Sequence, residues 1–206
     1  MEKISCICLT VPGRERFLQR AVRCFNEQTY ENRELIVVGD PGMDISIEGS
    51  GALYVPTSEK LTIGAKRNLA CESATGTLFA VWDDDDFSFP KRLEIQERYL
   101  YIYLKSVTAF DQIPFVQDDK WWLSPKDPMG VIGTSLFFTR SFWLSHPFPD
   151  VPAGEDVEFT RAAQKEKEFH LAPDAEVMFA TNHGSNTSKD RVMPLPRWRS
   201  LERAPW

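Results

Sequence analysis

The sequence predicts a single α/β domain built on a mainly parallel sheet, with a more mixed arrangement in its C-terminal half. Short apolar runs recur through the first half of the chain, as expected of strands that are covered on both faces. Segments with apolar residues at helical spacing separate these runs. The length of 206 residues is typical of one domain, and neither a repeat nor a linker divides it.

The first half alternates strands and helices. The strands are expected at residues 4–10, 35–38, 52–55 and 78–82. Helices are expected at 15–28 and 62–75, with a third starting at Ser88 just before Pro90. Gly76 stands where a left-handed residue would end the second helix. This order predicts a Rossmann-like sheet flanked by crossover helices.

The second half is less regular. Strands are expected near 106–110, 115–123, 131–138 and 176–180, and a helix at 156–167. We expect mixed or antiparallel pairing among these strands.

Composition narrows the class of protein. The chain has 24 basic and 30 acidic residues, a net charge of −6, which gives no overall attraction to nucleic acid or anionic membrane. Neither a signal-like segment nor an apolar run of roughly 20 residues is present, so we expect a cytoplasmic protein without a membrane span. The cysteines lie inside expected strands and helices, without metal-site spacing, and are predicted to be reduced and buried: Cys6, Cys8, Cys24 and Cys71.

Four consecutive aspartates, Asp83 to Asp86, directly follow the strand at 78–82. Neighbouring carboxylates in a partly dry cleft repel one another unless a cation lies among them. In open α/β sheets, ligands bind outside the carboxyl ends of the strands. Hard oxygen ligands there suit Mg²⁺ or Mn²⁺. The alternative is a solvated acidic turn at the start of the next helix.

An ordered set of motifs resembles the family 2 glycosyltransferases over about residues 3–188. The first half of the set reads ISCICLTVPGRERFLQRAV, ELIVVGD and GAKRNLACESATGTLFAVWDDDD, in which Asp83-x-Asp85 matches the DxD signature. The second half contains GTSLFFTRSFW, from Gly133 to Trp143, and then Gly154-Glu155-Asp156, similar to the acceptor-side ED motif.

The resemblance implies a GT-A fold and a metal-dependent, inverting transfer of a sugar from a nucleoside-diphosphate sugar to an acceptor hydroxyl. A UDP-sugar is the expected donor, and Mn²⁺ or Mg²⁺ the expected cofactor. Residues 1–90 would bind the nucleotide-sugar, residues 91–188 would form the acceptor side, and 189–206 would be a basic tail. The acceptor stays open: a glycan, a lipid-linked intermediate, a protein or a modified nucleic acid.

The resemblance also implies a set of donor contacts. The residues carried over to the nucleotide-sugar are Thr10, Arg14, Asp40, Lys66, Arg67, Asn68, Asp83 and Asp84. Asp40 would face the base, where the family often has two acids; this chain has Gly39-Asp40, so the identity of the base is open. Alternatively, Lys66 and Arg67 belong to an ordinary solvated helix face.

Further roles follow for the metal and the chemistry. Asp85 and His183 would bind the metal, with Asp86 in support. Asp156 would be the general base that deprotonates the acceptor, and Glu155 is the next choice. Alternatively, the two acids only start the 156–167 helix, where negative charge favours the helix dipole.

Two aromatic and basic features have open interpretations. Trp121 and Trp122 would either line an acceptor cleft, since sugars pack well against aromatic faces, or pack in the core or in a hairpin. The tail carries five basic residues against Asp190 and Glu202, and either closes over a diphosphate or packs as an ordinary terminus. Its basic residues are Lys189, Arg191, Arg197, Arg199 and Arg203.

Two other functions remain open. A nucleotidyltransferase also uses an α/β sheet and carboxylate-bound Mg²⁺, but it usually has a Gly-rich phosphate loop after the first strand, whereas Val11-Pro12-Gly13-Arg14 has one glycine. A non-catalytic carbohydrate- or nucleotide-binding module of the same fold would bind a donor without releasing nucleoside diphosphate.

Overall fold

The computed structural model describes residues 1–47, 51–126, 133–173, 176–183, 198–202 and 204. The strands in this part of the chain are β1 (Ile4–Thr10), β2 (Arg33–Gly39), β3 (Ala52–Pro56), β4 (Leu78–Val81), β5 (Phe87–Ser88), β6 (Val107–Phe110), β7 (Pro114–Gln117), β8 (Lys120–Leu123), β9 (Phe137–Thr139), β10 (Phe169–Ala172), β11 (Met178–Thr181) and β12 (Arg199–Leu201). The helices are α1 (Glu15–Asn26), α2 (Ile63–Ser73), α3 (Arg92–Tyr103), α4 (Arg140–Ser145) and α5 (Glu155–Lys165), with a 3-10 turn, η1 (Gly133–Ser135).

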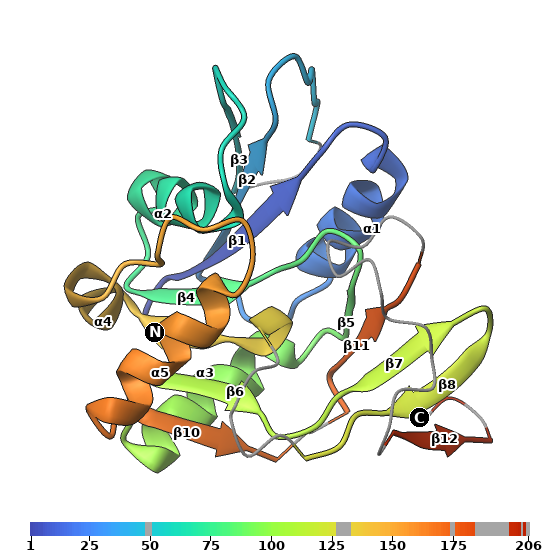
Figure 1. The fold of residues 1–206 in the computed structure, drawn as a ribbon, viewed down its shortest axis with the longest axis vertical. Helices are drawn as coiled ribbons and strands as arrows, with labels where there is room; N and C mark the ends of the chain where they lie inside the picture. The colour runs from blue at the N-terminus through green and yellow to red at the C-terminus, as the bar shows by residue number, and fades with distance from the viewer. Residues whose placement is uncertain (48–50, 127–132, 174–175, 184–197, 203, 205–206) are drawn as a thin grey trace.

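The larger sheet has seven strands in the order β10-β6-β9-β4-β1-β2-β3 and runs from β3 at the top of Figure 1 to β10 at the bottom. β1 is parallel to β2 and β4, and β2 is parallel to β3. β9 is antiparallel to both β4 and β6. The expected fold class, a mainly parallel sheet with a mixed C-terminal half, is therefore confirmed.

Alternation along the strands distributes apolar side chains to two cores, one on each face of this sheet. Cys6 and Cys8 of β1 pack with residues of α1 and α3, whereas Ile7 packs with residues of α2, α4 and α5. All four cysteines are buried and free, as expected.

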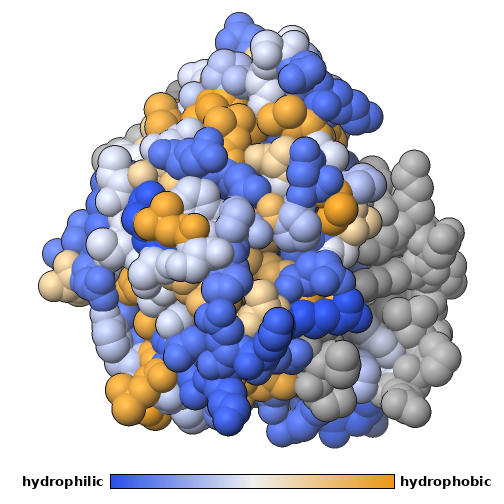
Figure 2. Space-filling view, turned by 60° about the vertical axis from the view of Figure 1, so that its left-hand side comes forward, coloured by the Kyte–Doolittle hydropathy of each residue, from blue (hydrophilic) through white to orange (hydrophobic). Residues whose placement is uncertain are grey.

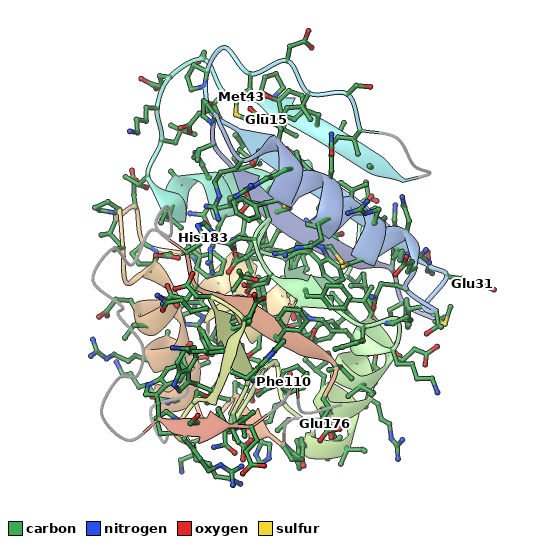
Figure 3. All side chains as sticks on the ribbon, turned by 90° about the vertical axis from the view of Figure 1, so that its right-hand side faces the viewer. Glu15, Glu31, Met43, Phe110, Glu176 and His183 are labelled. Carbon is green, nitrogen blue, oxygen red and sulfur yellow. The ribbon has the colours of Figure 1, made fainter. Side chains whose placement is uncertain are left out.

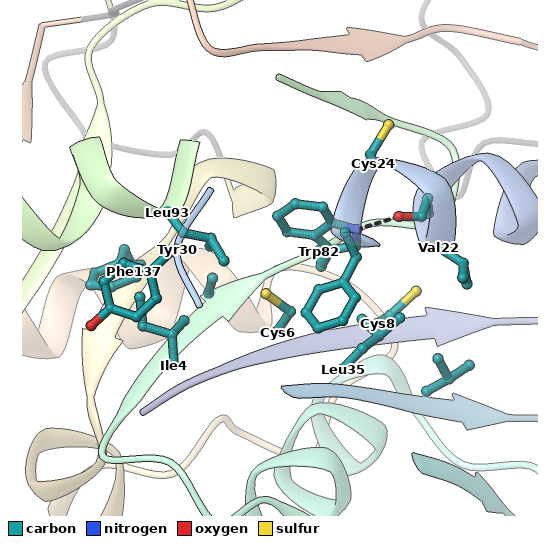
Figure 4. Close-up of a cluster of buried hydrophobic side chains, with 14 of the residues drawn as sticks. Ile4, Cys6, Cys8, Val22, Cys24, Tyr30, Leu35, Trp82, Leu93 and Phe137 are labelled. Atoms are coloured by element: carbon teal, nitrogen blue, oxygen red, sulfur yellow. Dashed lines mark hydrogen bonds between the residues drawn. The ribbon is translucent and has the colours of Figure 1, made fainter. Parts of the chain in front are cut away.

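Trp82 joins α1 to the strand end that precedes the acidic run (Figure 4). Its indole Nε1 donates a hydrogen bond of 3.1 Å to the carbonyl of Ala21, and its ring meets Phe25 edge-on. Because the side chain is almost fully buried, this contact fixes the position of α1 relative to the aspartates that follow.

The smaller sheet has the order β12-β8-β7-β11-β5 and lies beside the larger one (Figure 1). β7 and β8 form a hairpin whose turn residues, Asp118 and Asp119, have φ values of 50° and 59°. Positive φ at both central positions is the geometry of a tight hairpin turn. The expectation of one strand over 115–123 was wrong, because this Asp-Asp turn interrupts it.

Gly76 was wrongly expected to end α2 as a left-handed cap. The helix ends at Ser73, and Ala74 is already extended. Gly76 is required for another reason: a Cβ there would lie 2.4 Å from Ser5 Oγ and 2.5 Å from the carbonyl oxygen of Lys3. The glycine therefore allows a close approach between this loop and β1.

Ser88 does not start a helix. It lies in β5, and α3 begins four residues later at Arg92. The helix α4 was not anticipated; the hydroxyl of Thr139 accepts a 3.2 Å hydrogen bond from the backbone N–H of Phe142 and caps it.

The surface in Figure 2 shows hydrophobic residues in small, separate groups among hydrophilic ones. Among the residues that the structure describes, Leu104 is the most exposed large apolar side chain, and it follows α3 in a left-handed conformation. Over the described ranges, no helix is both long enough and apolar enough to cross a membrane.

Candidate active site

The acidic run lies at the carboxyl edge of the larger sheet, directly after β4 and beside the end of β1. Asp84, Asp85 and Asp86 are buried, with 2%, 7% and 7% of their surface exposed. The side chain of Asp83, in contrast, is 33% exposed. This burial contradicts the alternative of a solvated acidic turn.

Thr10, at the end of β1, and Arg14, at the start of α1, contact the carboxylates of Asp84 and Asp85. The hydroxyl of Thr10 donates a 2.8 Å hydrogen bond to Asp84 Oδ2, and the guanidinium of Arg14 lies 3.0 Å from Asp84 Oδ1. Arg14 also contacts Asp85 Oδ2, and the same oxygen lies 3.0 Å from Nε2 of His183. One carboxylate oxygen is thus shared by a guanidinium and an imidazole.

Asp86 faces inward and connects the two sheets. Its Oδ1 accepts a 3.0 Å hydrogen bond from the backbone N–H of Thr181 in β11, and its Oδ2 accepts one from the hydroxyl of Thr134 in η1. This carboxylate therefore positions the segment that carries His183, two residues beyond Thr181.

Arg92 is a supporting residue that the sequence analysis missed. It is fully buried and donates hydrogen bonds to the carbonyls of Val81 and Thr134, at 2.7 and 2.8 Å. Burial lowers the pKa of Arg92, and the nearby Asp86 opposes this change. Arginine in the first turn of a helix usually suggests a solvated residue, so nothing in the sequence indicated its role.

Burial disfavours the negatively charged form of the carboxyl groups in the acidic run. It raises the pKa of Asp84 to about 7, an effect that Arg14 opposes and Asp85 reinforces. Burial also raises the pKa of Asp86 well above its ordinary value, with Asp85 and Asp83 adding to the shift. Carboxylates in this state are stabilised by any additional cation.

Helix α2 contributes two cationic side chains next to the acidic run. Lys66 forms an ion pair with Asp40 at the end of β2. Arg67 Nε lies 3.3 Å from Glu155, and its NH2 lies 4.0 Å from Asp83 Oδ1. Lys66 and Arg67 are 5% and 7% exposed, which contradicts a solvated helix face. The NH1 group of Arg67 is buried and has no hydrogen-bond partner.

Asn68, the next residue, has a different environment. Its Nδ2 donates to the carbonyl of Phe148 at 2.8 Å, and its Oδ1 accepts from Trp143 Nε1 and Phe148 N, each at 3.0 Å. The amide thus binds α2 to the segment after α4. These contacts favour a structural role over the predicted nucleotide contact.

Glu155 and Asp156 begin α5, but their carboxylates differ. Glu155 is buried and paired with Arg67; burial raises its pKa, and Arg67 opposes that shift. Asp156 is half-buried, and its Oδ1 accepts a 2.9 Å hydrogen bond from Val157 N. Its Oδ2 lies so close to Gly133 that a Cβ there would be 2.1 Å away. Asp156 is therefore the more accessible of the two acids.

His183 lies just beyond β11, next to α1 (Figure 3). Its ring stacks on Phe17 with centroids 4.4 Å apart and planes 16° apart. Arg20 contacts the carbonyl of Asp85 and lies 3.2 Å from Thr181 Oγ1. Phe17 and Arg20 were not predicted as site residues, although each lies three residues from the previous one in the series Arg14, Phe17 and Arg20, a spacing that makes neighbours on a helix surface.

The side chains present fit a divalent ion in part. Asp85 and His183 offer one carboxylate oxygen and one imidazole nitrogen at the same point, a combination that suits Mn²⁺. Among the residues that the structure describes, no three His, Cys, Asp or Glu side chains are grouped as a complete ion site. Phosphate oxygens commonly supply the remaining ligands of an Mg²⁺ ion that one or two side chains hold.

The two remaining predicted features are the tryptophan pair and the basic tail. Trp121 packs edge-on against Phe179 at 5.0 Å, and Trp122 is buried in the hairpin. Of the basic tail, Arg199 forms part of β12, while residues 189–197 and 203 lie outside the described residues.

The family model for glycosyl transferase family 2 matches residues 6–154, more than half of the chain. The chain belongs to this family. Among curated relatives, it is 27% identical over 106 residues to the uncharacterized glycosyltransferase MJ1057 of Methanocaldococcus jannaschii, covering 47% of this chain and 37% of that protein.

Solved glycosyltransferase structures share the fold. A fragment of S. aureus TarS in complex with UDP-GlcNAc has a TM-score of 0.71 at 16% identity, covering 92% of this chain and 62% of that one. The mannosyltransferase PcManGT from Pyrobaculum calidifontis, in complex with GDP-Man and Mn²⁺, has a TM-score of 0.66 at 16% identity, covering 88% and 56%. The expected GT-A architecture is confirmed. The chain spans less than two thirds of each of these proteins.

Proposed function

We propose that this chain transfers a sugar from a nucleoside-diphosphate sugar to an acceptor hydroxyl, with the help of Mn²⁺ or Mg²⁺. One observation carries the proposal: Asp85 and His183 meet within the acidic run, and Arg67, whose NH1 is buried without a hydrogen-bond partner, approaches Asp83 of the same run. A carboxylate–imidazole pair and a buried N–H donor beside the same, partly exposed acidic run are complementary to a metal-bound diphosphate.

The donor would lie along the carboxyl edge of the larger sheet. Asp40 and Lys66, which pair beyond β2, would face the base, and Thr10 and Asp83 would flank the ribose. The related folds were solved with UDP-GlcNAc and with GDP-Man, which supports a nucleoside diphosphate as the donor class. We propose a UDP-sugar for this chain.

Each charged side chain would have a distinct part in the reaction. Asp85 and His183 would hold the divalent ion, which neutralises the diphosphate as it departs. Arg67 NH1 would donate to a phosphate oxygen. Asp156 would accept the proton of the acceptor hydroxyl while that oxygen attacks the anomeric carbon and the bond from this carbon to the diphosphate breaks. One displacement inverts the anomeric configuration.

Glu155 is less suited than Asp156 to act as the general base. It is buried and paired with Arg67, so its carboxylate already has a cationic partner. We therefore assign Glu155 to holding Arg67 in place, and Asn68 to holding the end of α2.

The test compares Asp156→Asn with Glu158→Gln, an exposed acid in the same first turn of α5. Release of nucleoside diphosphate from a panel of nucleotide-sugars is measured with Mn²⁺, alongside nucleotide affinity by calorimetry. We expect Asp156→Asn to lower turnover by roughly 10²–10⁴-fold with nearly unchanged nucleotide affinity, and Glu158→Gln to resemble the wild type.

Three outcomes would contradict the proposal. Wild-type turnover in Asp156→Asn would remove the general-base role. Binding of nucleotide-sugars without any release of nucleoside diphosphate would indicate a non-catalytic module. Pyrophosphate release from a nucleoside triphosphate and a sugar phosphate would indicate a nucleotidyltransferase.

A further inference from the structure

We propose that Arg14 is an internal counter-cation that occupies the acidic site until a divalent ion arrives, and that metal binding displaces its guanidinium. This inference rests on the proposed function, because it concerns the same metal site. It goes further by assigning a competition between a side chain and the ion, and therefore a coupling between metal and nucleotide.

The contacts of Arg14 place it where a metal would be bound. Its NH2 group bridges two buried carboxylates, 3.0 Å from Asp84 Oδ1 and in contact with Asp85 Oδ2. That Asp85 oxygen also lies 3.0 Å from His183 Nε2. A metal ion held by Asp85 and His183 would sit roughly 2.0–2.3 Å from each donor atom. The guanidinium and the ion would then face the same oxygen, so their charges would repel each other.

Arg14 also provides a charge that the neighbouring cations do not. Arg67 lies beside Asp83, and Arg20 donates to the main-chain carbonyl of Asp85 and to the hydroxyl of Thr181. The carboxylates of Asp84 and Asp85 thus have Arg14 as their shared guanidinium partner. A divalent ion supplies the same compensation with greater charge, so one cation can replace the other.

The attachment of Arg14 permits this displacement. It stands at the N-cap of α1, where its side chain makes no capping hydrogen bond. Its Nε is buried without a hydrogen-bond partner, so the carboxylates hold only the far end of the guanidinium. The preceding Pro12 and Gly13 are exposed, and Gly13 adopts a left-handed φ of 85° in open space. The side chain can therefore leave the site while α1 keeps its backbone hydrogen bonds.

The displaced guanidinium needs new acceptors, and a diphosphate supplies them. Metal and nucleotide should consequently bind with positive coupling: each removes part of the cost of the other's binding. Without nucleotide, Mn²⁺ must displace Arg14 into water and should bind weakly.

The experiment measures Mn²⁺ affinity by electron paramagnetic resonance of the free ion, with and without UDP, for the wild type and two variants. Arg14→Gln removes the charge. Arg16→Gln is the matched control, because Arg16 is exposed on the same helix turn and packs over the Phe17 ring. Circular dichroism establishes that each variant is folded.

We expect Arg14→Gln to bind Mn²⁺ without UDP roughly 5- to 150-fold more tightly than the wild type, the usual range of coupling between two ligands. The enhancement of Mn²⁺ affinity by UDP should shrink in this variant, and Arg16→Gln should match the wild type. Equal or weaker Mn²⁺ binding by Arg14→Gln would overturn the inference alone. Failure of every protein to bind Mn²⁺, with or without UDP, would overturn the metal part of the proposed function as well.

Discussion

Asn68 offers a direct test of whether a polar residue of α2 contacts the donor or supports the fold. Its side chain makes three hydrogen bonds, two to the backbone of Phe148 and one to the indole of Trp143. Asn68→Ala leaves all three partner groups without a bond. At about 1 kcal/mol for each, the expected destabilisation is about 3 kcal/mol. In a domain of this length, that corresponds to a fall in Tm of about 6–12 °C.

The assay pairs thermal unfolding with calorimetric titration of UDP at a temperature where the variant is folded. Ser73→Ala is the control on the same helix, since it removes a single hydrogen bond, from Ser73 Oγ to the carbonyl of Leu69. It should cost no more than about 1 kcal/mol. UDP affinity should be nearly unchanged in both variants. An unaltered Tm in Asn68→Ala together with a large loss of UDP affinity would refute this reasoning and support the nucleotide contact.

Two further predictions concern the base and the response to acid. Gly133→Ala should lower turnover about as much as Asp156→Asn while leaving UDP affinity intact, because its Cβ would collide with Asp156 Oδ2 at 2.1 Å; normal turnover would show that Asp156 acts from another position. Burial alone would raise the pKa of Glu34, but hydrogen bonds from Lys3 and Ser5 outweigh it and lower this pKa from 4.5 to about 2. The stabilisation is therefore present above pH 4.5, reaches up to about 3 kcal/mol, and is lost as the pH falls from 4.5 to about 2. In urea unfolding, Glu34→Gln should have a lower free energy of unfolding than the wild type above pH 4.5, and this difference should disappear by about pH 2. A difference that does not change with pH would contradict this role of the Glu34 carboxylate.

The sequence was most informative where one local pattern decided the structure. The apolar run of β1 and the helical spacing in α1 were both predicted correctly, because each element buries a continuous face against the same core. A hairpin was one of the alternatives for Trp121 and Trp122, but the break within 115–123 was not predicted, because its turn is made by Asp118 and Asp119 rather than by glycine. The short α4 was missed because six residues are too few to establish a periodicity.

The sequence predicted those residues of the candidate site that lie directly after a strand. The acidic run and Asp40 were found because they directly follow buried strands. Arg92 and Phe17 could not be found in this way, since their roles depend on partners far away in the sequence. Arg92 donates to Thr134, 42 residues later, and Phe17 stacks on His183.

The contacts of the acidic run connect the two predicted halves of the chain more closely than a boundary near residue 90 suggests. Asp86 binds Thr134 and Thr181, both from the second half, and Asp85 meets His183, 98 residues later. Since Asp86 positions the end of β11, the imidazole reaches Asp85 only when the smaller sheet has formed. Residues 1–90 carry the carboxylates but not His183, the second metal ligand that we propose. The proposed donor site therefore depends on the smaller sheet as well as on the strand that precedes the DxD motif.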